Sequence, residues 1–255
     1  MKSAGAAMPP QANAPEWSSG KFLDKPGPSP YTGKPFCAGQ HPEKPSLEGG
    51  PAFTMNMESL LQDTAALYPE KTALIFDDHQ ICYRDLDRFV DALAAHFQTL
   101  GAGKGDKIAL ALGNGPEFVI AYFAALRIGT VAVTLNIMST AYELQHLLED
   151  SDAKILVAGE SQAKRYETVA ATLPQCKTLI SAAGWKPGSP FYDIVHTGAG
   201  TAAPPALGRD DAAVMIYTAG LTGKPMGAVL TYKNLGTQAE LLRTICNGTS
   251  ADRAL

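Results

Sequence analysis

The sequence predicts an α/β fold with an open, mostly parallel sheet flanked by helices. From residue 107 onward, short apolar runs alternate with longer amphipathic stretches, a pattern typical of parallel strands joined by crossover helices. Most of the apolar runs are apolar throughout and do not alternate with polar residues, as in strands covered on both faces. With 255 residues, 45% of them hydrophobic, the chain can build the core of one or two domains.

The first 50 residues differ in composition from the remainder. They hold nine of the 18 prolines, many Gly, Ser and Ala residues, and no periodic apolar pattern. Such a segment buries too little apolar surface to offset the entropy lost on ordering. We therefore predict that residues 1–50 are disordered and that residues 51–255 form the folded part, with order beginning near Phe53.

Before residue 107 the pattern predicts a helix, a hairpin and a second helix. Residues 54–70 carry apolar side chains at helical spacing and end at a proline. The runs 72–78 and 80–86 predict two strands around a polar turn. Residues 83–103 predict an amphipathic helix that is closed by a glycine. Its apolar stripe consists of Leu86, Phe89, Val90, Leu93, Ala94, Phe97 and Leu100.

The alternating part predicts strands and helices in regular succession. Thr140 and Thr231 are the expected N-caps of two of its helices. Residues 184–210 are rich in Gly, Pro and Ala and predict an irregular connection. The predicted strands are 107–112, 130–135, 154–159, 176–182, 211–218 and 227–231, and the predicted helices are 117–129, 140–151, 161–174 and 232–245.

Charge and targeting signals exclude several classes of protein. The formal net charge is -4 and no block of Lys and Arg occurs, so a nucleic-acid or anionic-membrane partner has no electrostatic support. The N-terminus lacks the apolar core of a signal peptide. The most apolar stretch, Phe118–Leu135, is interrupted by Arg127 and predicts a buried helix running into a strand, with no transmembrane segment.

The cysteine pattern predicts reduced thiols without a metal. The four cysteines show no C-x-x-C spacing and no accompanying His cluster, which argues against a zinc site or a disulfide framework. Cys176 and Cys246 belong to no nucleophile motif, and we expect them to be buried and inert.

The stretch "MIYTAGLTGKPMGAVLT", Met215–Thr231, is the main candidate site. A small-residue loop that leaves the end of a strand can present successive backbone N–H groups to an anion, and threonine hydroxyls add donors or reach a metal. A Walker A loop requires a glycine and a Ser or Thr where this chain has Thr218 and Pro225, so that motif does not fit. The pattern alone leaves phosphate binding and an ordinary glycine turn open.

The longer stretch "YTAGLTGKPMGAVLTYKNL" resembles the signature of the acyl-adenylate-forming (AMP-binding) superfamily, Y-T-S-G-T-T-G-x-P-K-G-A-V-L-T-H-x-N-L. Fifteen of the nineteen positions fit; Ala219, Leu221, Met226 and Tyr232 differ. Residues 82–136 and 142–158 resemble fatty acid–CoA ligases. The resemblance covers roughly residues 55–255 and is strongest to the N-terminal portion of a long-chain fatty acid–CoA ligase.

The resemblance implies ATP-dependent activation of a carboxylic acid to an acyl-adenylate, followed by transfer to coenzyme A. It implies that the loop binds the phosphates of ATP, with Mg²⁺ near the hydroxyl of Thr218 or Thr222. The fatty acid substrate is expected to be of medium or long chain; aryl and other relatives share the pattern. The implied phosphate-binding residues are Thr218, Ala219, Gly220, Leu221, Thr222, Gly223 and Lys224.

Two kinds of departure qualify these implications. Ala219 and Leu221 each remove a hydroxyl donor and Met226 replaces a cation; each donor lost from an anion costs roughly 1.5–3 kcal/mol. By resemblance, the catalytic residues lie beyond residue 255, so we expect a truncated N-terminal domain that is inactive alone, or one half of a protein whose other half is a separate chain. The alternative is a non-catalytic pseudo-enzyme or interaction module. We expect a cytoplasmic protein, with a peripheral membrane location left open.

Overall fold

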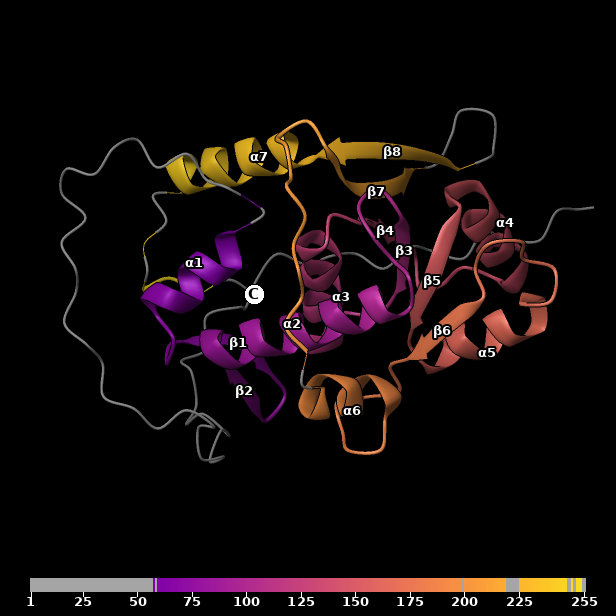
Figure 1. The fold of residues 1–255 in the computed structure, drawn as a ribbon, viewed down its shortest axis with the longest axis horizontal. Helices are drawn as coiled ribbons and strands as arrows, with labels where there is room; N and C mark the ends of the chain where they lie inside the picture. The colour runs from indigo at the N-terminus through magenta and orange to yellow at the C-terminus, as the bar shows by residue number, and fades with distance from the viewer. Residues whose placement is uncertain are drawn as a thin grey trace, which may run out of the picture. The chain divides into compact units, whose positions relative to one another are not determined.

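The computed structural model describes residues 57, 59–198, 200–218, 225–246, 249 and 251–253. In this part of the chain a six-stranded sheet has the order β6-β5-β3-β4-β7-β8, with helices on both faces (Figure 1). Neighbouring strands are parallel except β7 and β8, which are antiparallel. The prediction of an open, mostly parallel sheet is thus confirmed. The strands are β3 (Lys107–Ala111), β4 (Val131–Thr134), β5 (Ala153–Ala158), β6 (Thr178–Ser181), β7 (Ala212–Thr218) and β8 (Met226–Thr231).

Helices connect the parallel strands. Pro116 occupies the first turn of α3 and Thr140 caps α4 in a reciprocal box with Glu143, as the sequence predicts. The helices in this part are α2 (Tyr83–Thr99), α3 (Pro116–Arg127), α4 (Ala141–Ser151), α5 (Glu160–Val169), α6 (Pro190–Thr197) and α7 (Tyr232–Ile245).

The sheet separates two hydrophobic cores. One core lies under α2, α3 and α6 and includes Phe97, Ile108 and Phe191. The other lies under α4 and α5 and includes Leu144, Val133 and Leu156. Consecutive residues of a strand point to opposite faces, so Ile108 and its neighbour Ala109 belong to different cores. Burial on both faces explains why these strands are apolar throughout.

The segment before the sheet forms a helix and a hairpin. The helix α1 (Leu60–Leu67) precedes the strands β1 (Thr72–Phe76) and β2 (His79–Cys82), which pair antiparallel. The hairpin turn contains Asp77 in the left-handed region at φ 48°, a conformation that Asp tolerates better than most residues. The predicted helix, strands and turn are therefore confirmed, with shorter helices and strands than the sequence suggested.

Two sequence expectations change, and a third lies outside the described residues. The segment predicted as an irregular connection contains α6, which begins with a proline in its first turn and buries Phe191 and Val195. Leu100, assigned to the apolar stripe of α2, is the residue after that helix and is 39% exposed. The predicted disordered segment, residues 1–50, lies outside the described residues.

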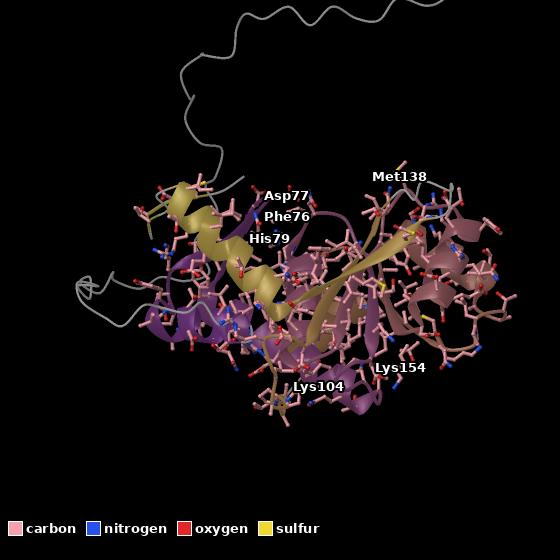
Figure 2. All side chains as sticks on the ribbon, turned by 90° about the horizontal axis from the view of Figure 1, so that it is seen from above. Phe76, Asp77, His79, Lys104, Met138 and Lys154 are labelled. Carbon is pink, nitrogen blue, oxygen red and sulfur yellow. The ribbon has the colours of Figure 1, made fainter. Side chains whose placement is uncertain are left out.

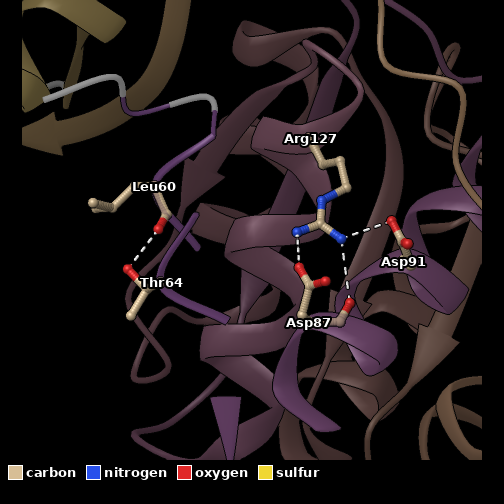
Figure 3. Close-up of polar contacts among 5 residues, drawn as sticks. All are labelled: Leu60, Thr64, Asp87, Asp91 and Arg127. Carbon is tan, nitrogen blue, oxygen red and sulfur yellow. Dashed lines mark hydrogen bonds and ion pairs between the residues drawn. The ribbon is translucent and has the colours of Figure 1, made fainter. Parts of the chain in front are cut away.

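A buried arginine joins α3 to α2. Arg127 is only 5% exposed, although it stands in the most apolar part of the chain. Figure 3 shows its guanidinium donating to the Asp91 carboxylate at 2.6 Å, to the backbone carbonyl of Asp87 at 3.2 Å and to the Asp87 carboxylate. Asp87 and Asp91 are one turn apart on α2, so one cation pairs with both. Figure 3 also shows a hydrogen bond within α1, in which the Thr64 hydroxyl donates to the Leu60 carbonyl. The donor–acceptor distance is 2.7 Å.

We predict that the double variant Asp87→Asn/Asp91→Asn loses about 3–5 kcal/mol of unfolding free energy, because it leaves a buried guanidinium without a counter-charge. Arg127→Met is expected to lose less, since both aspartate side chains are about a quarter exposed and can be hydrated. Urea unfolding followed by far-UV circular dichroism measures both. Asp78→Asn, on the exposed hairpin turn, is the matched control. A double variant as stable as this control would contradict the prediction.

Candidate nucleotide-phosphate site at the end of strand β7

The strand β7 carries the candidate loop to the carboxyl edge of the sheet. It pairs parallel with β4, with Val214 beside Ala132 and Ile216 beside Thr134. Its other neighbour is β8, and their last pair joins Thr218 to Met226. Ligands of open α/β sheets usually bind outside the carboxyl ends of the parallel strands, so the geometry agrees with the location expected of a binding loop.

The loop itself joins the two strand ends that the structure fixes. Of the seven predicted phosphate-binding residues, Thr218 is described and exposed, while residues 219–224 lie outside the described residues. Met226 lies across from Thr218 in the ladder and is 63% exposed. The resemblance places a lysine at position 226, and the register shows that such a side chain would start from the strand position opposite the Thr218 hydroxyl.

Tyr217 anchors the end of β7 to the neighbouring helix α4. Its hydroxyl donates to the Asp150 carboxylate at 2.7 Å and lies 3.5 Å from the Leu147 carbonyl. Burial, and then the hydrogen bond to Asp150, raise the pKa of Tyr217 well above its usual value, so the phenol stays protonated and donates. No local pattern in the sequence indicates this contact, because Asp150 is remote in the sequence.

Close packing explains the glycine of β8. A Cβ on Gly227 would lie 3.0 Å from the Met215 sulfur and 3.1 Å from Met215 Cγ. Gly227 pairs with Tyr217 in the ladder. A larger residue would therefore push against Met215 just where β7 approaches the loop. This glycine coincides with a glycine of the family signature and has a packing role that the sequence alone did not indicate.

Both outer ends of the β7–β8 hairpin are fixed as well. Asp211, just before β7, pairs with Lys104 at 2.7 Å, and its carboxylate accepts from the Gly208 N–H at 2.6 Å. These contacts lower the pKa of Asp211, the Gly208 contact most. Thr231, just after β8, caps α7 in a reciprocal box with Asn234, as predicted. The hairpin is thus held at its base while its tip carries the loop.

Of the two residues that the resemblance brings near Mg²⁺, Thr218 is described and exposed. In the described part of the chain no group of three or more His, Cys, Asp and Glu side chains could hold a metal ion. The Thr218 hydroxyl fits as a single hard-oxygen ligand, and Mg²⁺ in nucleotide sites commonly takes most of its other ligands from phosphates and water. Thr222, the alternative ligand, lies outside the described residues.

Two cysteines, Cys176 and Cys246, were considered as nucleophiles. Cys176 is buried, and burial raises its pKa to about 12, so its thiol is not a nucleophile near neutral pH. The prediction of a buried, inert thiol is confirmed for Cys176. It is wrong for Cys246, which is exposed at the end of α7, because the outer face of that helix is not covered by any described residue.

Comparison with protein families identifies the class of fold. The model of the AMP-binding enzyme family matches residues 61–255. The chain belongs to the AMP-binding enzyme family. The matched range includes the whole six-stranded sheet, both walls of the candidate loop and the loop itself. The signature resemblance and the observed register therefore concern the same segment.

The curated proteins that this chain resembles include CoA ligases. A crotonobetaine/carnitine–CoA ligase of Salmonella paratyphi A is 30% identical over 191 residues, which cover 71% of this chain and 37% of that protein. The chain thus spans less than half the length of the curated relatives it matches.

Within the described residues, no helix is both long and apolar enough to cross a membrane.

Solved CoA ligases share its fold. A fatty acyl CoA synthetase of Mycobacterium tuberculosis has a TM-score of 0.60 and 26% identity, covering 69% of this chain and 34% of that one. A benzoate CoA ligase of Burkholderia xenovorans has a TM-score of 0.63 and 28% identity, covering 73% and 36%. The mostly parallel sheet flanked by helices therefore matches that of adenylate-forming enzymes, and the similar proteins act on both aliphatic and aromatic acids.

We predict that Tyr217→Phe loses about 1 kcal/mol of unfolding free energy, since it removes one hydrogen bond and keeps the ring. The loss of the tie to α4 should also raise amide exchange at the end of β7, measured by hydrogen–deuterium exchange. Tyr142→Phe is the control, because that tyrosine is 81% exposed. Equal exchange at residues 212–218 in Tyr217→Phe and in the unaltered chain would contradict the anchoring role.

Proposed function

We propose that this chain is part of an ATP-dependent acid–thiol ligase that activates a carboxylic acid, with coenzyme A as the acceptor. The reaction joins the carboxylate to the α-phosphorus of ATP and releases pyrophosphate; the CoA thiol then takes the acyl group and AMP leaves. The observation that carries the proposal is the Thr218–Met226 pair, which frames the family's phosphate loop at the carboxyl edge of the sheet.

The role proposed for the loop is to bind the two phosphates that leave. Backbone N–H groups of residues 219–224, with the Lys224 ammonium and the Thr218 and Thr222 hydroxyls, would donate to the phosphate oxygens. Magnesium, when bound, would neutralise phosphate charge, with Thr218 or Thr222 as one ligand. The strand ends on either side are fixed by the register of β7 and β8 and by the Tyr217–Asp150 contact, so the two points from which the loop starts and to which it returns are set before ATP arrives.

The substitutions in the signature reduce the number of side-chain donors without removing the backbone ones. Ala219 and Leu221 lack hydroxyls and Met226 lacks a charge. Backbone N–H groups do not depend on side-chain identity, and Lys224 supplies a cation two residues from position 226. We therefore propose a remodelled loop that still binds pyrophosphate, with weaker affinity than the usual signature gives.

The acid proposed as substrate is a medium- or long-chain fatty acid. The resemblance of residues 82–136 to fatty acid–CoA ligases and the similarity to a fatty acyl CoA synthetase support this choice. The relatives named for crotonobetaine/carnitine and for benzoate show that the same fold serves short and aromatic acids. We also propose a cytoplasmic location. The partners proposed for the chain are the carboxylic acid, ATP and CoA.

A non-catalytic interaction module is the second candidate function. The lost donors at Ala219, Leu221 and Met226 favour it, and so do the exposed apolar side chains of α7, among them Leu241 and Ile245. Binding of nucleotide separates the two candidates, because only a working loop needs to hold phosphate. A separate chain that completes the enzyme is compatible with the first candidate.

We predict that ATP with Mg²⁺, at tenfold excess over its dissociation constant, raises the melting temperature of the chain by about 3 °C or more. Lys224→Met should weaken binding about tenfold or more, because a charged donor to phosphate is lost. Met226→Lys should strengthen it by a similar factor, since it restores a cation opposite Thr218. Lys233→Met, on an exposed lysine of α7, is the matched control. The proposal fails if Lys224→Met binds as well as this control.

We predict that the purified chain releases no pyrophosphate above background when given ATP, Mg²⁺, CoA and a fatty acid. By resemblance, the groups that hold adenine and catalyse the transfer lie beyond residue 255. A full-length fatty acid–CoA ligase assayed in parallel is the positive control. Pyrophosphate release by the chain, abolished by Lys224→Met, would show that the chain is a complete catalyst and overturn this prediction.

A further inference from the structure

A cavity of about 330 Å³ opens at the carboxyl ends of β3, β5 and β6, on a different part of the sheet edge from the β7–β8 loop. Leu112, Gly159 and Ala182, the residues that follow these three strands, form its floor. Figure 2 shows the hairpin-turn residues Phe76, Asp77 and His79 on the same side of the view as Met138, which follows β4, and opposite Lys104 and Lys154. The volume is within the range of small-molecule sites.

The walls of the cavity combine carboxylates with aromatic rings. Asp77 and Glu117 line it together with His79, and no Lys or Arg does. Neither carboxylate forms an ion pair with any residue that the structure describes. Phe76 and Trp185 supply the rings. An electronegative ring face beside unpaired carboxylates attracts a cation, and this combination recurs where proteins recognise ammonium groups.

The Trp185 wall is held in place by packing. The Trp185 ring meets Phe89 edge-to-face at 5.5 Å and Tyr192 at 5.3 Å between centroids. The Phe76 ring and the Glu117 carboxylate both lie beside Gly115, where a Cβ would be 3.6 Å from the ring and 3.0 Å from the carboxylate. Fixed rings lose little entropy when a ligand arrives, which favours binding.

Two helices also begin at the cavity, and their dipoles would favour an anion. The N-caps Gly115 of α3 and Gly159 of α5 have no capping side chain. Glu117, in the first turn of α3, offsets that positive end with its own charge. Burial leaves the Glu117 carboxylate incompletely hydrated and so raises its pKa, while a hydrogen bond from its own N–H opposes the shift. A cationic partner would stabilise this carboxylate. Because the carboxylates that line the cavity are negatively charged, we expect it to prefer a cation over an anion.

We propose that this cavity binds a small organic cation, an ammonium group with an apolar body, among the carboxylates of Glu117 and Asp77 and the rings of Trp185 and Phe76. The ammonium pairs with the carboxylates and its apolar part contacts the rings. The cavity is separate from the phosphate loop, and its occupancy does not depend on whether the chain binds ATP.

Trp185 provides a direct signal of binding, because the chain has one other tryptophan, Trp17. In a Trp17→Phe background, titration with choline is expected to change Trp185 fluorescence saturably. The neutral isostere 3,3-dimethylbutan-1-ol should bind at least about tenfold more weakly, because it lacks the charge that the carboxylates recognise. Equal binding of the two compounds would overturn the proposal, as would the absence of a saturable change up to molar choline.

Two variants test which groups recognise the charge. Glu117→Gln keeps the shape of the side chain and should weaken choline binding about tenfold, whereas Asp78→Asn, on the same turn as Asp77 but outside the cavity, should leave it unchanged. Binding should also weaken as the pH falls through the raised pKa of Glu117. Circular dichroism confirms that each variant is folded. Unchanged binding in Glu117→Gln would overturn the proposal.

Discussion

The parallel pairing of β7 with β4 is the constraint on which the rest of the structure depends. It joins residues far apart in the sequence, Ala132 with Val214 for example, and it sets where the β7–β8 hairpin lies in the sheet. Such a long-range contact must offset a large loop-closure entropy. Burial of Ala213 and Val214 against the core under α3, together with the hydroxyl of Tyr232 donating to the Leu126 carbonyl at 2.7 Å, supplies part of that compensation.

Much of the fold follows from local signals in the sequence. Apolar runs, proline at the start of α3 and threonine caps at α4 and α7 act within a few residues, so their structural result can be predicted. The helix α6 was missed because the surrounding Gly and Pro residues obscured its short apolar pattern. The pairing of Arg127 with two aspartates and of Tyr217 with Asp150 joins different helices and strands, so no local pattern indicates it.

The candidate site, like the fold, could be predicted from the sequence only in part. The signature predicted which segment carries the loop, and the register adds that position 226 stands across from Thr218 at its mouth. Loop residues 219–224 lie outside the described residues, so their contacts stay a prediction. The cavity beside Glu117 was not predicted, because its residues come from a hairpin, three strand ends and the segment before α6. Residues gathered from so many places leave no spacing signal in a sequence.

The most direct test of the central claim is hydrogen–deuterium exchange of the chain with and without ATP and Mg²⁺. A phosphate held by backbone N–H groups must slow the exchange of those same amides. We predict protection of residues 219–224, with little change at the other glycine-rich segment, residues 101–105. Equal exchange of residues 219–224 in the presence and absence of saturating nucleotide would contradict the claim that this loop binds phosphate.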